Sequence, residues 1–272
     1  MAGWFEQANW NLALFTLILG GVLLASIRAA LRGRVPRVRV LPGVAAMAEA
    51  VGRAVEMGRP VFFVPGTRDL DNVQTVAGLA VLGELAALTA RLECRLEVLT
   101  DRSLVMAAAR EAGRAAYLAA GRPETWRDDS VSYVSDDQFG FVARVDGLIA
   151  RERPATCFWL GAFSAESLLL AEAGSQIGAI QIAGTAERSQ LPFFIAACDY
   201  TLIGEELFAA SACLTGDPAL LGTLRGQDLG KAVAGGALLL GSLLATAAAL
   251  THWPFIVKLQ SALQRLFSAG GP

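Results

Sequence analysis

Histidine and lysine are almost absent from this chain of 272 residues. The only histidine is His252, and the only lysines are Lys231 and Lys258, all near the C-terminus. The stretch before Lys231 therefore has no imidazole to activate a serine or cysteine nucleophile or to bind a metal. It also has no amine for a P-loop or a Schiff base, which excludes those classes of enzyme.

Motifs for dinucleotides, redox chemistry and nucleic acids are missing as well. No GxGxxG segment occurs, which argues against nicotinamide-dinucleotide binding. The net charge of −2 and the pI of about 5.6 provide no basic surface, so we expect no nucleic-acid partner. The cysteines form no CxxC pair and three of them lie in or beside apolar runs, so we predict free thiols in a reducing compartment. They are Cys94, Cys157, Cys198 and Cys213.

The chain is strongly apolar, with a mean hydropathy of +0.47. Two uncharged segments, residues 7–27 and 232–251, account for much of this value. Each is close to the roughly 20 residues that a helix needs to cross a bilayer. We therefore predict a domain anchored in the membrane at both ends.

Flanking charges predict the orientation of these anchors. Five arginines lie between Arg28 and Arg39, whereas the residues before the first segment carry only Glu6. The positive-inside rule then predicts a cell-membrane protein with two spans, a cytoplasmic central domain and both termini outside. A cleaved signal peptide fits poorly, because no Lys or Arg precedes the apolar stretch.

These features divide the chain into four predicted parts. Residues 1–34 are an anchor with its arginine-rich flank, and residues 35–228 are the cytoplasmic domain. Residues 229–252 form the second transmembrane helix. Residues 253–272 are an amphipathic tail on the outer membrane surface, unless the second helix simply continues into solvent.

Small residues recur every fourth position in the second apolar segment. A stripe of this kind lets two helices approach closely in lipid. Gly21 and Ala25 offer a matching face on the first segment, and contact with another subunit is an equal alternative. The high alanine and glycine content explains the stripe equally simply. Its members are Ala237, Gly241, Ala245 and Ala249.

Between the anchors, short apolar runs alternate with helical patterns. We predict strands at 60–64, 95–99, 131–134, 156–160, 177–183 and 193–197, with helices between them and a last helix at 205–214. Alternation of this kind is typical of an α/β fold: a Rossmann-like, mainly parallel sheet with helices on both faces.

Polar side chains follow these strands, where ligands bind in such sheets. Because Asp, Ser and Thr also begin helices, Asp71, Asp101, Asp137 and Ser164 are candidate N-caps. The alternative is a shared ligand cleft, in which the arginines would bind an anion. Its candidate ligand-binding residues are Thr67, Arg68, Asp69, Thr100, Asp101, Arg102, Asp136, Ser164, Glu166 and Asp199.

Two segments resemble an uncharacterised family of prokaryotic membrane proteins that is known as a domain of unknown function. They are PGTRDLDNVQT at 65–75 and EELFAASACLTGDPALLGTLRGQDLGK at 205–231. The resemblance implies a Rossmann-like soluble domain between two transmembrane helices. It implies no activity and no catalytic residue.

We therefore expect a membrane-anchored, non-catalytic protein that acts as a scaffold or docks a partner. Its partners would be the lipid bilayer and either further copies of itself or the other subunits of a membrane complex. We predict no catalytic residue, resident metal or cofactor. One alternative is a cytoplasmic-facing sensor domain for a small anionic ligand. Another is a divalent-metal-dependent hydrolase, since carboxylates suit Mg²⁺.

Overall fold

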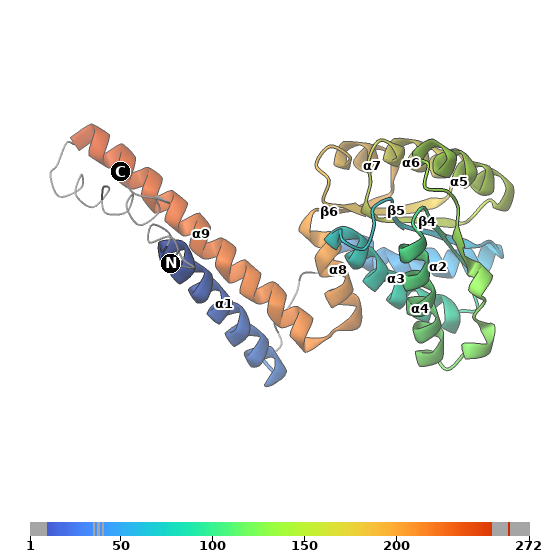
Figure 1. The fold of residues 1–272 in the computed structure, drawn as a ribbon, viewed down its shortest axis with the longest axis horizontal. Coiled ribbons are helices and arrows are strands. Elements are labelled where there is room, and N and C mark those ends of the chain that lie inside the picture. The colour runs from blue at the N-terminus through green and yellow to red at the C-terminus, as the bar shows by residue number, and fades with distance from the viewer. Residues whose placement is uncertain (1–9, 35, 37–38, 40, 252–260, 262–272) are drawn as a thin grey trace, which may run out of the picture. The chain divides into compact units, whose positions relative to one another are not determined.

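The computed structural model describes residues 10–34, 36, 39, 41–251 and 261. The chain forms two compact units, which are described separately (Figure 1). Arg39–Thr215 is the α/β unit, and Met1–Val38 with Gly216–Pro272 is the helical unit. The predicted tail at 253–272 lies outside the described residues, apart from Ser261.

The α/β unit is built on one sheet of six strands. All neighbouring strands are parallel, in the order β3-β2-β1-β4-β5-β6. The predicted fold class is confirmed. The order reverses between β1 and β4, which is where α/β sheets of this type open a crevice for ligands. The strands are β1 Val61–Gly66, β2 Leu96–Thr100, β3 Val131–Tyr133, β4 Thr156–Ala162, β5 Ile180–Thr185 and β6 Tyr200–Ile203.

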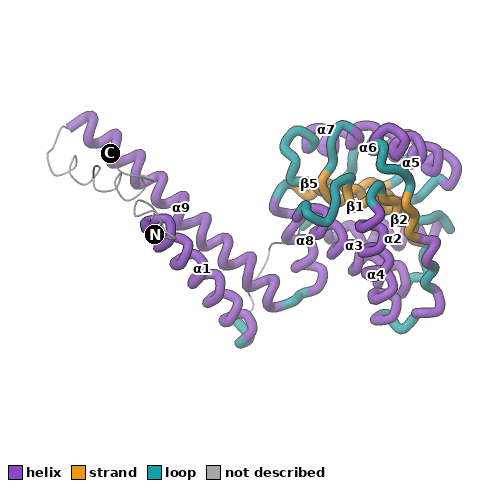
Figure 2. Tube along the Cα trace, in the orientation of Figure 1, coloured by secondary structure: helices purple, strands orange, loops and turns teal. Residues whose placement is uncertain are grey.

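Helices cover both faces of the sheet, as Figures 1 and 2 show. Because both faces are covered, every residue of β1 and β4 is buried and their sequences are apolar almost throughout. One core contains Phe63 and Phe158 and lies under α2, α3, α4 and α8. The other contains Phe62 and Trp159 and lies under α5, α6 and α7. The helices are α2 Pro42–Met57, α3 Val73–Arg91, α4 Ser103–Ala119, α5 Gln138–Glu152, α6 Glu166–Gln176, α7 Leu191–Ala197 and α8 Glu205–Thr215, with short 3-10 turns η2 Pro123–Thr125 and η3 Asp128–Ser130.

One strand prediction is wrong. The apolar run at 193–197 belongs to helix α7, and the sixth strand is β6. A short apolar run is compatible with either a buried strand or a buried helix. Pro192 in the first turn favours the helix, since its missing N–H costs nothing there.

The helical unit contains two long apolar helices, α1 Trp10–Leu31 and α9 Pro218–Thr251. By length and composition, two helices could cross a membrane: α3 and residues Pro218–Leu250 of α9. More than half of α3 is buried inside the α/β unit, so its apolarity serves the core. Phe15–Leu31 of α1 is a shorter apolar helix.

Glycines bring α1 and α9 together. A Cβ on Gly222 would lie 2.9 Å from the Cα of Ile27, and one on Gly226 would lie 3.1 Å from the Cα of Leu23. Gly21 and Ala25, the face predicted from the sequence, are exposed. The contact therefore uses a different stripe from the predicted one.

The predicted stripe on α9 does not follow one face of the helix. Ala237 and Gly241 are partly covered, but Ala245 and Ala249 are exposed, and Ala248 is buried instead. At 3.6 residues per turn, a row of every fourth residue drifts about 40° around the helix at each step. A row of four such residues therefore leaves the covered face.

Candidate functional site

The loops after β1 and β4 are held together by main-chain contacts. Gly66 ends β1 at φ +87°, where a Cβ would lie 2.6 Å from the carbonyl oxygen of Ala162. The N–H of Thr67 donates to that same oxygen at 2.8 Å. Only glycine combines this backbone conformation with this approach. The point where the strand order reverses is therefore a rigid frame.

Helix α3 lies unusually close to this frame. A Cβ on Gly78 would lie 2.2 Å from the carbonyl oxygen of Leu160 in β4, a backbone atom. Any larger residue would push α3 away from the sheet. Gln74, in the first turn of the same helix, accepts the N–H of Ala186 at 2.6 Å and so ties α3 to the loop after β5.

A cavity of about 120 Å³ opens at the carboxyl ends of β1 to β4. Its wall combines guanidinium, carboxylate and hydroxyl groups with one buried ring, Phe141. Most of the predicted ligand-binding residues meet here. The lining residues are Thr67, Arg68, Asp101, Arg102, Asp136, Gln138, Phe141, Ser164 and Glu166.

Glu166 organises this wall. The side chain is 1% exposed, and its Oε1 accepts the N–H of Ser164 at 2.7 Å and the hydroxyl of Thr67. Its Oε2 accepts the amide of Gln138 from α5. Both carboxylate oxygens are thus occupied by the protein, and Glu166 holds three separate segments in place.

Arg68 extends the same arrangement. Its Nη2 donates to the hydroxyl of Ser164 at 3.1 Å. Among the described residues, Arg68 forms no ion pair with a carboxylate. Its positive charge therefore lies at the cavity without an ion-pair partner in the part of the chain that the structure describes.

Asp101 is the least satisfied group in the wall. It is 5% exposed, and its Oδ1 has no hydrogen-bond partner among the described residues. The nearest cation is Arg102, whose Nε lies 3.5 Å from Oδ2 and itself lacks a hydrogen bond. Burial raises the pKa of Asp101 to about 6, and the charge of Arg102 opposes that shift only in part.

The alternative role of these residues as helix caps is tested directly by the structure. Asp137 caps α5 by accepting the N–H of Gly140 at 2.6 Å, so that prediction is confirmed. The other three are wrong. Asn72, one residue after Asp71, caps α3. The N-cap positions of α4 and α6 are Arg102 and Ala165, which give no side-chain cap, so Asp101 and Ser164 do not cap a helix.

Three predicted ligand residues lie elsewhere. The Oδ1 of Asp69 accepts the N–H of Leu70, and Thr100 is buried between β2 and β3, where it donates to the carbonyl of Ser132. Asp199 precedes β6 and accepts the N–H of Gln181, the second residue of β5, at 2.8 Å. It therefore lies at the amino edge of the sheet, because the segment before it is a helix and not the predicted strand.

Two lining residues were not foreseen. Gln138 and Phe141 belong to the first turn of α5. Helix α5 follows β3, which ends at the carboxyl edge of the sheet. This order of elements is the one feature of the sequence that indicates that the first turn of α5 lies near the cavity.

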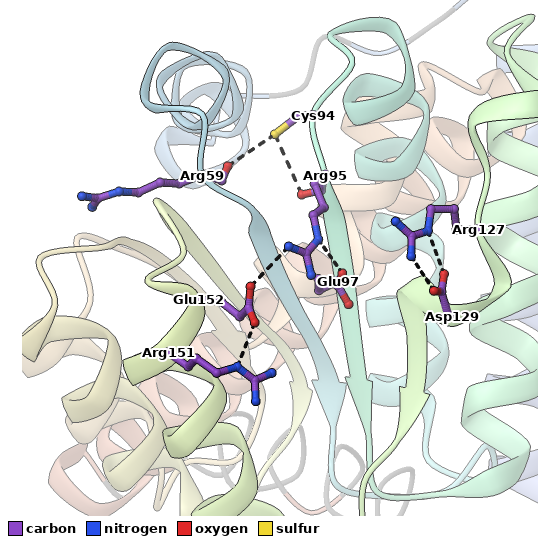
Figure 3. A network of polar contacts seen from close by, with 8 residues as sticks. All are labelled: Arg59, Cys94, Arg95, Glu97, Arg127, Asp129, Arg151 and Glu152. Atoms are coloured by element: carbon purple, nitrogen blue, oxygen red, sulfur yellow. Dashed lines mark hydrogen bonds and ion pairs between the residues drawn. The ribbon is translucent and has the colours of Figure 1, made fainter.

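A second charged cluster occupies the amino edge of the sheet (Figure 3). The Nε of Arg95 donates to Glu97 at 2.8 Å, and its Nη1 donates to Glu152 at 3.2 Å. Arg151 donates to the other oxygen of Glu152 at 2.9 Å. Every carboxylate of this cluster is paired with an arginine, and no buried side-chain atom in it lacks a partner.

No group of three or more His, Cys, Asp or Glu side chains arranged to hold a metal ion occurs in the part of the chain that the structure describes. Two of the carboxylates in the cavity wall have different kinds of partner. Glu166 is bonded to neutral donors, and Asp101 lies beside Arg102.

Comparison with known proteins gives one match. A family model described as a domain of unknown function (DUF6754) matches residues 1–256. No curated protein and no solved structure matched the chain.

Proposed function

This chain belongs to the DUF6754 family, and we propose that it is a membrane-anchored binding protein whose α/β unit takes up a small anionic ligand at the carboxyl ends of β1 to β4. One observation carries the proposal. The cavity wall contains two guanidinium groups, Arg68 and Arg102, and neither donates a hydrogen bond to a carboxylate. An arginine held at a cavity without such a partner is suited to a ligand carboxylate or phosphate.

The surrounding groups support the same proposal. The hydroxyls of Thr67 and Ser164 lie in the wall and are positioned by Glu166 and Arg68. The cavity lies where the strand order reverses, the usual ligand position in this class of sheet. The cavity therefore combines rigid loops with the positive charge of Arg68, which has no ion-pair partner among the described residues.

The membrane part of the proposal rests on the helical unit. Residues Pro218–Leu250 of α9 are long and apolar enough to span a bilayer, and the apolar α1 packs along α9. Arg28, Arg32 and Arg34 follow or end α1. With the positive-inside rule, these residues support a cell-membrane protein with two spans, a cytoplasmic α/β unit and both termini outside. Protease protection of tags at the two termini in inverted vesicles tests this topology.

Calorimetric titration of the full chain in detergent tests ligand binding. The probes are phosphate, pyrophosphate, citrate, glutamate, ribose 5-phosphate and AMP. We expect at least one anion to bind, and Arg68→Ala to weaken its binding by roughly tenfold or more, as loss of a charged hydrogen bond does. Arg151→Ala, at the amino edge, is the matched control and should bind as the wild type does. Absence of binding to every anion, or equal binding by Arg68→Ala, would refute the proposal.

The scaffold role expected from the sequence is a separate matter. It stays a prediction, which the native mass of the purified assembly tests.

A further inference from the structure

The state of Asp101 restricts what the ligand can be. Its carboxylate already has a positive neighbour in Arg102, so its charge is partly balanced. Its Oδ1, however, is buried without a donor. A buried acceptor left without a hydrogen bond is costly, and the cost disappears when a donor arrives. Asp101 therefore lacks a hydrogen-bond donor more than it lacks a counter-ion.

A hydroxyl group fits this need better than an ammonium group. A cationic donor at Asp101 would also lie beside the guanidinium of Arg102, whose Nε is 3.5 Å from the carboxylate. A neutral hydroxyl supplies the donor without that repulsion. Arg68, at the same cavity, is the group that still lacks an anion. The complementary ligand therefore carries hydroxyls and an anionic group on one small framework.

The place of Asp101 in the fold narrows the choice. It follows β2 directly, in a sheet of order 3-2-1-4-5-6. In such sheets, an acidic residue after the second strand accepts hydrogen bonds from ribose hydroxyls. In this chain that position is Asp101, whose Oδ1 has no hydrogen-bond partner among the described residues. The strand order is common to many proteins, but this unsatisfied oxygen is a feature of this chain.

The phosphate position differs from that of dinucleotide-binding sheets. There, the helix after β1 receives the pyrophosphate at its N-terminus. In this chain the corresponding helix is α3, and the side chain of its N-cap residue, Asn72, already accepts the N–H of Gln74 at 2.9 Å. The side chain of Arg68, which has no ion-pair partner among the described residues, is the better candidate to bind an anion. The cavity of about 120 Å³ is also small beside pockets of roughly 300–1,000 Å³ for larger ligands, so it suits one sugar ring.

We propose that the ligand is a phosphorylated ribose, free or as part of a ribonucleotide, with a ribose hydroxyl donating to Asp101 and the phosphate bound by Arg68. This proposal rests on the proposed anion-binding function and names its ligand class. The two residues divide the recognition: Asp101 selects the sugar, and Arg68 binds the phosphate.

Calorimetric titrations of the full chain in detergent with matched sugars test whether Asp101 recognises the sugar and Arg68 the phosphate. The probes are ribose 5-phosphate and AMP, their 2-deoxy counterparts, 3′-deoxy-AMP and phosphate. We expect at least one deoxy form to bind roughly tenfold more weakly than its parent. Asp101→Ala, which removes the acceptor, should reduce this preference to about twofold or less. Arg68→Ala should weaken ribose and deoxyribose forms alike and so keep the preference.

The outcomes separate the two proposals. Tighter binding of AMP than of ribose 5-phosphate supports a nucleotide, and equal binding supports a free sugar phosphate. If every deoxy form binds as its parent does, or if Asp101→Ala keeps the full preference, the ribose assignment is overturned. If citrate, glutamate or phosphate binds but no ribose phosphate does, the assignment also falls while the anion-binding function stands. If no anion binds, both fall.

Discussion

The amino and carboxyl edges of the β-sheet carry the same kinds of charged side chain. At the amino edge, Arg95 is bonded to both Glu97 and Glu152, and the cluster is closed on itself (Figure 3). At the carboxyl edge, Asp101 and Arg68 face a cavity without an equivalent partner. Composition alone does not distinguish the two edges, but the completeness of their hydrogen bonding does.

The difference supports the proposal that the amino edge stabilises the fold and the carboxyl edge binds a ligand. Paired, half-exposed charges contribute modestly to stability and leave nothing for a ligand to satisfy. A buried carboxylate with one oxygen left without a hydrogen bond costs stability, and ionisable groups with shifted pKa values are concentrated at functional sites. Burial raises the pKa of Asp101, which shows that the folded protein disfavours its ionised form. The unsatisfied acceptor of Asp101 therefore supports the proposal that a ligand binds at this edge.

The largest effect on this comparison is expected from Gly78→Ala. Its Cβ would lie 2.2 Å from the carbonyl oxygen of Leu160, so α3 must move away from β4. We expect a loss of about 3 kcal/mol or more in the free energy of unfolding, measured by denaturant titration. Because α3 carries part of the frame of the carboxyl edge, anion binding should be lost too.

Gly83→Ala is the matched control, because it lies in the same helix with open space around its Cβ. It should be neutral or gain up to about 1 kcal/mol through helix propensity. Equal stabilities of the two variants would show that the close approach of α3 to β4 is not structurally required.

The architecture of the α/β unit is predictable from the sequence because its causes are local. Doubly covered strands such as β1 and β4 read as short apolar runs, and helices separate them. The exception, residues 193–197, shows the limit: five apolar residues fit either element until their neighbours are known. Because this run was predicted as a strand, Asp199 was expected at the carboxyl edge of the sheet, whereas it lies at the amino edge.

The candidate site is predictable in its position and not in its detail. Strand ends of a parallel sheet converge, so Thr67, Asp101 and Ser164 are expected together, and the cavity contains all three. The sequence does not tell whether Asp101 caps a helix or is left without a partner. That depends on where α4 begins, a difference of one residue. Gln138 and Phe141 lie in the first turn of α5. The sequence does not predict that they line the cavity, because tertiary packing sets the orientation of this helix.

Asp101→Asn should increase the stability of the protein, whereas Gly78→Ala should decrease it. The pKa of Asp101 rises from 3.8 to about 6 in the folded protein. The cost of the ionised form is therefore complete above pH 6 and disappears below about pH 4. We expect the variant to be more stable than the wild type by about 1–2 kcal/mol at pH 7.5, with the difference vanishing near pH 4. Thermal unfolding of both proteins across this pH range measures it.

Asp128→Asn is the control, because the pKa of Asp128 is shifted in the opposite direction to that of Asp101. Hydrogen bonds from Arg114 and Trp126 lower the pKa of the Asp128 carboxyl, so its ionised form stabilises the fold above the unfolded pKa. That variant should lose stability at neutral pH and regain parity in acid. A loss of stability in Asp101→Asn at pH 7.5 would contradict the view that Asp101 is an uncompensated group.

The smallest effect is expected at the amino edge, from Arg95→Ala. The side chain of Arg95 is 54% exposed, so solvent screens its pairs with Glu97 and Glu152. We expect a loss of about 0.5–1 kcal/mol in the free energy of unfolding. Burial already raises the pKa of Glu97, and removal of Arg95 should raise it further, so the loss should be greatest at pH values where Glu97 is ionised and should fade in acid. Anion affinity, measured by the same calorimetric titration, should be unchanged. Equal weakening of anion binding by Arg95→Ala and Arg68→Ala would show that the two edges do not have separate roles. That result would contradict the proposal that the cavity is the binding site.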